Sequence, residues 1–129
     1  MENEKVKYWI ELSDYDLKTA EAMLDTKRFL YVGFMCHQAV EKVLKALYAF
    51  QSNKIPPYTH DLFQLLKETK LLKDLSVEQN NCINFLQPMN IQARYPAYKD
   101  LLSKSLTEEK CKYLIKETEE FTTWIKTKL

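Results

Sequence analysis

Glycine is almost absent from this chain of 129 residues, in which Gly33 is the single example. Loops that cradle phosphates and the tight turns of most all-β folds need glycine where the backbone takes a positive φ or approaches another group closely. The composition therefore excludes a Walker-type or Rossmann nucleotide site and argues against an all-β fold. The four prolines stand near the expected connections, which leaves long proline-free stretches for helices.

Neither sign of charge is in excess, since 19 Lys and Arg face 18 Asp and Glu and the net charge is +1. The chain as a whole therefore does not attract nucleic acid or an anionic membrane, and any bound anion must be held by a local cluster. With 46% hydrophobic and 29% charged residues, the composition is that of an ordinary globular protein. The length fits one domain over residues 1–129.

Long hydrophobic runs are also missing. The longest, near Leu30 to Met35, is far too short to cross a bilayer. The first five residues are acidic and polar, unlike the basic start of a signal peptide. We expect a cytoplasmic protein without membrane contact.

Metal-binding and redox motifs are absent. Cys36, Cys82 and Cys111 are widely separated and form no CxxC pair, so we expect buried free thiols in a reducing compartment. His37 and His60 are the only two histidines, which excludes a His-rich metal site and leaves open a mixed site built with carboxylates. We expect no cofactor and no metal.

Apolar residues recur at helical spacing along most of the chain. They predict an amphipathic helix over about residues 4–25 and a second over about 29–52. The second is apolar around most of its circumference, as expected for the central helix of a bundle. Residues 53–58 contain Pro56-Pro57 and predict a connection.

The second half shows several helix starts. Thr59 is the expected N-cap of a helix that carries leucines at 62, 65, 66 and 72, and Ser76 and Thr107 are expected caps of two more. The stretch 92–105 is the least regular, because Arg94-Tyr95-Pro96 interrupts it. Without any convincing strand alternation, the pattern predicts an all-α antiparallel bundle of four to five helices.

The informative residues are polar ones on the most apolar helix. Gln38, Glu41 and Lys45 are spaced i, i+3, i+7 and share one face, with Lys42 beside them. One interpretation is a solvated helix edge on which Glu41 pairs with Lys45 at i, i+4. The other is a binding site.

The remaining polar residues each allow two interpretations. His60 and Asp61 are expected in the first turn after the cap, where Asp61 suits the helix dipole and His60 is either a local hydrogen-bonding residue or a ligand contact. His37 is expected to be a satisfied core or interface histidine. Arg94 would either offer a guanidinium fork to phosphate or close its loop onto the bundle by a salt bridge, for example to Glu41.

Taken together and in order, these segments resemble the HEPN domain family over nearly the whole chain. The resemblance rests on Trp9 with Asp16-Leu17 and Ala20, on the segment from His37 to Ala46 (HQAVEKVLKA), on Thr59-His60-Asp61-Leu62, on Arg94-Tyr95-Pro96 and on Trp124-Ile125. It implies a bundle of four to five helices, commonly a homodimer, often encoded beside a minimal nucleotidyltransferase in toxin–antitoxin-like pairs. By position it implies a ligand-binding patch of six residues, namely Gln38, Glu41, Lys42, Lys45, His60 and Arg94.

Many HEPN toxins are metal-independent ribonucleases that carry arginine followed about four to six residues later by histidine. There the histidine acts as general base or acid on the 2′-hydroxyl and the arginine stabilises the charge on phosphorus. This sequence departs from that motif, because Arg28 is too far ahead of His37 and no histidine follows Arg94. Catalysis would need an atypical pair, such as His60 with Arg94.

Three functional hypotheses follow from these residues. The first is a binding module for a nucleotide, for RNA or for a nucleotidyltransferase partner, and it needs only the polar patch and an interface. The second is a ribonuclease with an atypical Arg/His pair. The third is a structural interaction bundle without a ligand. Because the family's ribonuclease motif is absent, we expect the first.

Overall fold

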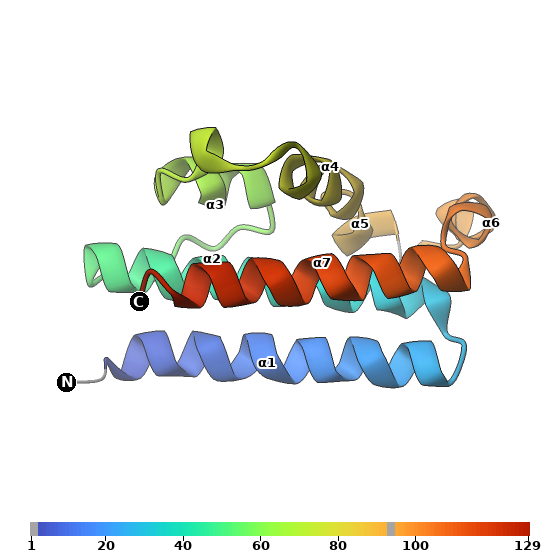
Figure 1. Ribbon diagram of the computed structural model, residues 1–129, viewed down its shortest axis with the longest axis horizontal. Helices are drawn as coiled ribbons and strands as arrows, with labels where there is room; N and C mark the ends of the chain where they lie inside the picture. Colours follow the sequence, from blue (N-terminus) through green and yellow to red (C-terminus); the bar gives the residue numbers. More distant parts are fainter. Residues whose placement is uncertain (1–2, 93–94) are drawn as a thin grey trace.

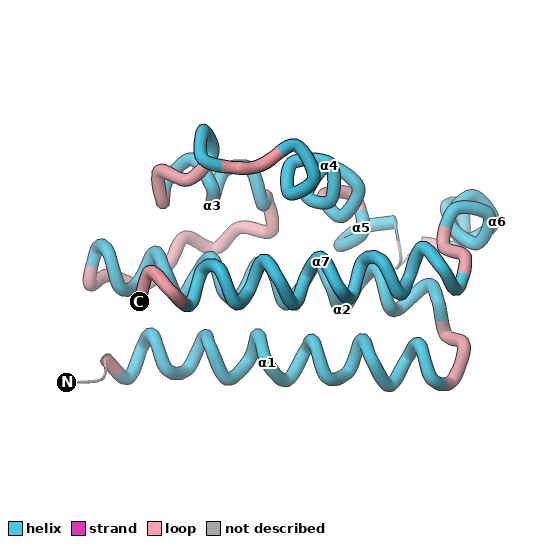
Figure 2. The backbone as a smooth tube through the Cα atoms, in the orientation of Figure 1, coloured by secondary structure: helices cyan, strands magenta, loops and turns pink. Residues whose placement is uncertain are grey.

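The computed structural model describes residues 3–92 and 95–129, without the side chains at 92 and 96–99. Over these residues the chain consists of helices joined by loops, which confirms the all-α prediction (Figure 2). The elements in chain order are α1 (Glu4–Asp25), α2 (Phe29–Ser52), α3 (Leu62–Glu68), the 3-10 helix η1 (Leu72–Asp74), α4 (Val77–Leu86), α5 (Met89–Gln92), α6 (Pro96–Ser105) and α7 (Glu108–Lys126).

Three long helices form the body of the bundle. Helices α1 and α2 are antiparallel, whereas α7 runs in the same direction as α2, because the elements from α3 to α6 carry the chain back along the bundle (Figure 1). Those shorter elements form a second layer over α2 and α7 (Figure 1). The first two helices begin and end where their apolar periodicity predicts.

Helix α2 is the centre of the core. Its apolar side chains are buried around most of its circumference and pack against α1, α3 and α7. The largest fully buried apolar side chains of the core are Leu44, Leu47, Leu62, Leu65, Leu66, Ile83, Leu86, Leu106, Leu114 and Ile125. Because neighbouring helices surround α2, polar residues on it can be buried as well.

The start of α3 differs from the prediction. Asp61, and not Thr59, is the N-cap, since its carboxylate accepts hydrogen bonds from the backbone N–H groups of Phe63 and Gln64. The Thr59 hydroxyl instead accepts a hydrogen bond from the Asp61 backbone N–H at 3.1 Å. His60 consequently lies before α3, in the connection. The same helix ends at Glu68, so Leu72 belongs to η1 and not to α3.

The stretch around Pro96 is more regular than predicted. Residues 96–105 form α6, and Pro96 occupies the first position of this helix. Proline is well suited to that position, because the first residues of a helix have N–H groups without an intrahelical partner. The predicted caps Ser76 and Thr107 are confirmed, and Ser76 forms a capping box with Gln79.

Gly33 marks a close approach between α2 and the second layer. A Cβ atom at this position would lie 3.1 Å from the Met89 sulfur and 3.6 Å from the Leu106 side chain. The absence of a side chain therefore lets α5 pack closely on the first half of α2. That contact brings Asn90 of α5 within reach of the polar face of α2.

Candidate functional site

The polar face of α2 is buried. Glu41 is 1% exposed, Lys45 6% and Gln38 8%. Their interpretation as a solvated helix edge is therefore wrong, although the predicted pair of Glu41 with Lys45 is confirmed. The reason is tertiary: Trp9 of α1 lies over the Lys45 ammonium group, and His60 of the α2–α3 connection reaches Glu41.

Glu41 is the centre of the site. One carboxylate oxygen, Oε2, accepts a hydrogen bond from Lys45 Nζ at 3.0 Å. The other, Oε1, lies 2.8 Å from Nδ1 of His60 and 3.9 Å from Nδ1 of His37. Since an ionised carboxylate only accepts hydrogen bonds, Nδ1 of His60 carries the hydrogen, and Nε2 is the ring atom left for a ligand.

The backbone around His60 is held on both sides. The Thr59 N–H donates to the Pro57 carbonyl at 2.9 Å, and the Thr59 hydroxyl donates to the Gln64 side chain at 3.0 Å. On the other side, the Gln87 amide donates to the Asp61 carboxylate at 2.8 Å. These bonds fix the backbone of the connection. The His60 imidazole is therefore held beside Glu41, although the His60 side chain is 49% exposed.

A second group of polar contacts continues along the same face. Lys42 Nζ donates to Asp16 Oδ2 of α1 at 3.0 Å and to Gln38 Oε1 at 3.3 Å. The Gln38 amide then donates to Asn90 Oδ1 of α5 at 2.9 Å. The face therefore joins α1, α2 and α5 through side chains that are buried or nearly so.

The site carries little net charge. Lys42 faces Asp16 and Lys45 faces Glu41, so each of the two ammonium groups is neutralised by a carboxylate. Among the five predicted site residues that the structure describes, His60 has the most exposed side chain. The geometry consequently limits how strongly these residues alone can hold a polyanion.

His37 is fully buried beside this site. Its ring nitrogens make no hydrogen bond to the described residues, and its polar neighbours are the Glu41 carboxylate and the backbone of His60. Burial lowers the pKa of His37 to about 4, although the Glu41 charge acts in the opposite direction. The side chain is therefore neutral at pH 7. The prediction of a core histidine is confirmed.

Five of the six predicted site residues thus lie on one continuous polar face, and the sixth, Arg94, lies outside the described residues. Sequence reasoning assigned no role in the site to Asp16, Asn90 or Trp9. Asp16 and Trp9 stand on the helix that pairs with α2, and they belong to the segments quoted for the family resemblance. Asn90 carries no signal, because a single asparagine two residues after a proline is typical of an ordinary turn.

The cysteines take no part in the site. Cys36, Cys82 and Cys111 are buried and free, as predicted. Burial raises the pKa of the Cys36 and Cys82 thiols to about 12 and that of Cys111 to about 11, so all three are protonated and unreactive at neutral pH. Over residues 3–92 and 95–129, no group of His, Cys, Asp and Glu side chains is arranged to hold a metal ion.

Comparison with protein families identifies the chain. The model of the HEPN domain matches residues 6–128, which is nearly its whole length. The chain belongs to the HEPN domain family. Its fold is also that of TT1696 from Thermus thermophilus, a crystal structure with a TM-score of 0.82 and 19% sequence identity. That match covers 98% of this HEPN domain and all of the other chain.

No curated protein matches this HEPN domain. At 19% identity, the structural match establishes the fold alone. None of the helices in the described part of the chain has the length and apolar character that a transmembrane span requires. The candidate functional residues are therefore those of the polar face of α2 around Glu41, together with the half-exposed His60.

Proposed function

We propose that this HEPN domain is a binding module that takes the phosphate group of a nucleotide or of RNA at its polar face. The ligand-binding residues would be Gln38, Glu41, Lys42, Lys45, His60 and Arg94. In this proposal the module works beside a nucleotidyltransferase partner in a toxin–antitoxin-like pair. The single observation that carries the proposal is the buried Glu41 carboxylate, which holds Lys45 at 3.0 Å and the half-exposed His60 at 2.8 Å.

The energetics of this arrangement support a role beyond stability. Burying a lysine and a glutamate together removes the hydration of both, and an apolar pair of similar volume stabilises a protein at least as well. This buried pair also orients the half-exposed His60, and a role in ligand binding explains that arrangement better than a role in stability. Asp16 and Glu41 neutralise the two lysines, so the phosphate would be held chiefly by His60 and Arg94, with the lysines as a second layer of charge.

The first prediction concerns phosphate binding. We expect calorimetry to detect the binding of ATP, GTP or a short RNA by the wild type. Because a charge-assisted hydrogen bond contributes about 1.5–3 kcal/mol, His60→Gln and Arg94→Ala should each weaken binding roughly tenfold or more. Lys67 is exposed on α3, so Lys67→Ala serves as the control and should not change binding. If the wild type binds none of these ligands at millimolar concentration, the proposal is wrong.

A second candidate function, a metal-independent ribonuclease, is favoured by the contact between Glu41 and His60. A carboxylate bound to Nδ1 leaves Nε2 free to take the proton of a ribose 2′-hydroxyl, as in the carboxylate–histidine pairs of hydrolases. The 2′-oxygen would then attack the adjacent phosphorus to form a 2′,3′-cyclic phosphate. The bond to the 5′-oxygen would break as that oxygen takes up a proton from water and leaves as a 5′-hydroxyl. Cleavage of RNA that disappears in His60→Gln would support this function, whereas binding without cleavage supports the module.

Assembly is the next prediction. We expect a homodimer, because the chain is a HEPN domain and the α5–α6 stretch exposes large apolar side chains. Ile91 is 58% exposed and Leu101 66%. Sedimentation at micromolar concentration should give twice the monomer mass, and Leu101→Glu should shift the population towards monomer. A clean monomer in the wild type would contradict an obligate interface.

A further inference from the structure

An apolar cleft of about 380 Å³ lies next to the polar face. It is lined by Tyr8 and Trp9 of α1 and by Ile55 and Pro56 of the α2–α3 connection, with Glu4 and Lys5 at its edge. Its volume falls at the lower end of the range of small-molecule sites, roughly 300–1,000 Å³. A larger cavity of about 720 Å³ near Phe50 and Leu129 contains none of the predicted site residues.

The cleft and the polar face share a wall. The Trp9 ring contributes to the cleft and also lies 5.3 Å from Lys45 Nζ, which in turn donates to Glu41. The Tyr8 and Trp9 rings meet edge to face at 5.2 Å, so the exposed Tyr8 ring is held by its neighbour. A ligand that reaches from His60 across this wall would place an apolar group in the cleft.

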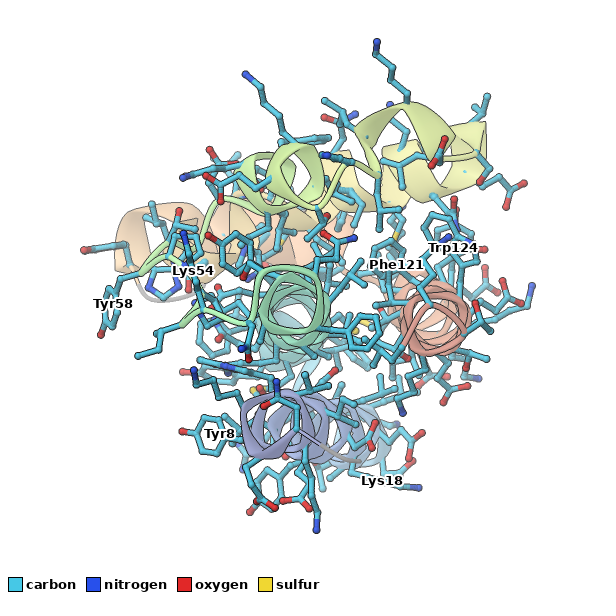
Figure 3. All side chains as sticks on the ribbon, turned by 90° about the vertical axis from the view of Figure 1, so that its left-hand side faces the viewer. Tyr8, Lys18, Lys54, Tyr58, Phe121 and Trp124 are labelled. Carbon is cyan, nitrogen blue, oxygen red and sulfur yellow. The ribbon has the colours of Figure 1, made fainter. Side chains whose placement is uncertain are left out.

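A second exposed ring stands beside His60. Tyr58 is fully exposed, and its ring centre lies 6.5 Å from that of His60. Figure 3 shows Tyr8 and Tyr58 on the same side of the bundle, opposite to Phe121 and Trp124.

We propose that the cleft binds an unpaired base of a single-stranded RNA whose phosphate lies at His60. This inference rests on the proposed function and names its ligand class. The lining is almost wholly apolar, so it offers a surface for the face of a base and no groups that read its edge. Stacking of this kind accepts any base, because every base has a π-face. In a duplex those faces are covered, so a paired base cannot enter.

The two tyrosines decide between an oligonucleotide and a mononucleotide. Tyr8 lines the cleft, and Tyr58 stands beside His60. Two stacking surfaces, one in the cleft and one beside the phosphate position, match two successive bases of a strand, and a mononucleotide has only one base. The chemistry therefore points to RNA with at least two unpaired nucleotides.

The test is a set of fluorescence anisotropy titrations of the full chain with a labelled eight-nucleotide single-stranded RNA. Alanine substitution of a stacking ring weakens binding by roughly tenfold or more, so Tyr8→Ala should raise Kd by about that factor. Tyr8→Phe should bind like the wild type, because stacking does not need the hydroxyl group. Tyr31→Ala, at the opposite end of α2 and 47% exposed, is the matched control and should bind normally.

Competition with unlabelled ligands separates this inference from the function on which it rests. The single strand should compete well, its duplex poorly, and AMP and ribose 5-phosphate weakly. If Tyr8→Ala binds RNA like the wild type while His60→Gln does not, the base subsite is wrong and phosphate binding stands. AMP that competes as well as RNA would overturn the assignment to a strand. RNA that does not bind at all would overturn both proposals.

Discussion

Replacing Glu41 by leucine is expected to lower the free energy of unfolding by about 3–5 kcal/mol, the range found when one partner of a buried ion pair is removed. The Glu41 and Lys45 side chains are only 2% and 7% exposed. Without the carboxylate, the Lys45 ammonium group remains buried under Trp9 with a single weak cation–π contact. Urea unfolding with linear extrapolation measures the loss.

A second variant separates the ion pair from simple packing. When Glu41→Leu is combined with Lys45→Met, no charge is left without a partner, and most of the lost stability should return. The exposed pair of Lys116 with Glu120 is the control, and Glu120→Gln should change stability by less than about 0.5 kcal/mol. A double variant that loses as much as the sum of both single variants would show that the pair is not coupled.

The next largest effect is a loss of stability in acid that depends on His37. Its folded pKa of about 4 lies below the ordinary histidine value of 6.5. The unfolded chain therefore binds the proton first as the pH falls. The stabilising contribution of the neutral ring is complete above about pH 6.5 and is lost as the pH falls towards 4. The loss amounts to about 2 kcal/mol at pH 5 and about 3 kcal/mol at pH 4.

The His37→Leu variant tests this account, because leucine has a similar size and no proton to bind. Within the described residues, the polar neighbours of the ring are the Glu41 carboxylate and the backbone of His60. The two proteins should be about equally stable at pH 7, and the variant should be the more stable at pH 5. The difference between the two pH curves therefore reports the contribution of the His37 ring. Parallel curves would contradict a buried neutral histidine.

The sequence predicts a helix well where the apolar spacing and the capping residues of that helix alone define it. Apolar spacing gives α1 and α2 with their observed bounds, and the side chains of Ser76 and Thr107 mark true helix starts. The errors lie where two local patterns compete. Thr59 and Asp61 are both good caps by residue type, and the contact of Gln87 with Asp61 is tertiary information that the local sequence does not contain. Pro96 predicts an interruption of helical structure, although it is the first residue of α6.

The site shows the same division between local and tertiary information. The spacing of Glu41 and Lys45 predicts a shared face and a pair, and both follow from helix geometry alone. Whether that face meets solvent depends on Trp9 and on the path of residues 53–61, which no local pattern specifies. The lack of hydrogen bonds at His37 is likewise a property of the packed core.

Two-dimensional ¹H–¹⁵N spectra of the histidine rings test the central claim most directly, because the chain contains only His37 and His60. When single-stranded RNA is added, the ring signals of His60 should shift, Nε2 more than Nδ1, since Glu41 already holds Nδ1 at 2.8 Å. The signals of buried His37 should move little. RNA that binds to saturation while the His60 signals stay unchanged would contradict the assignment of this site.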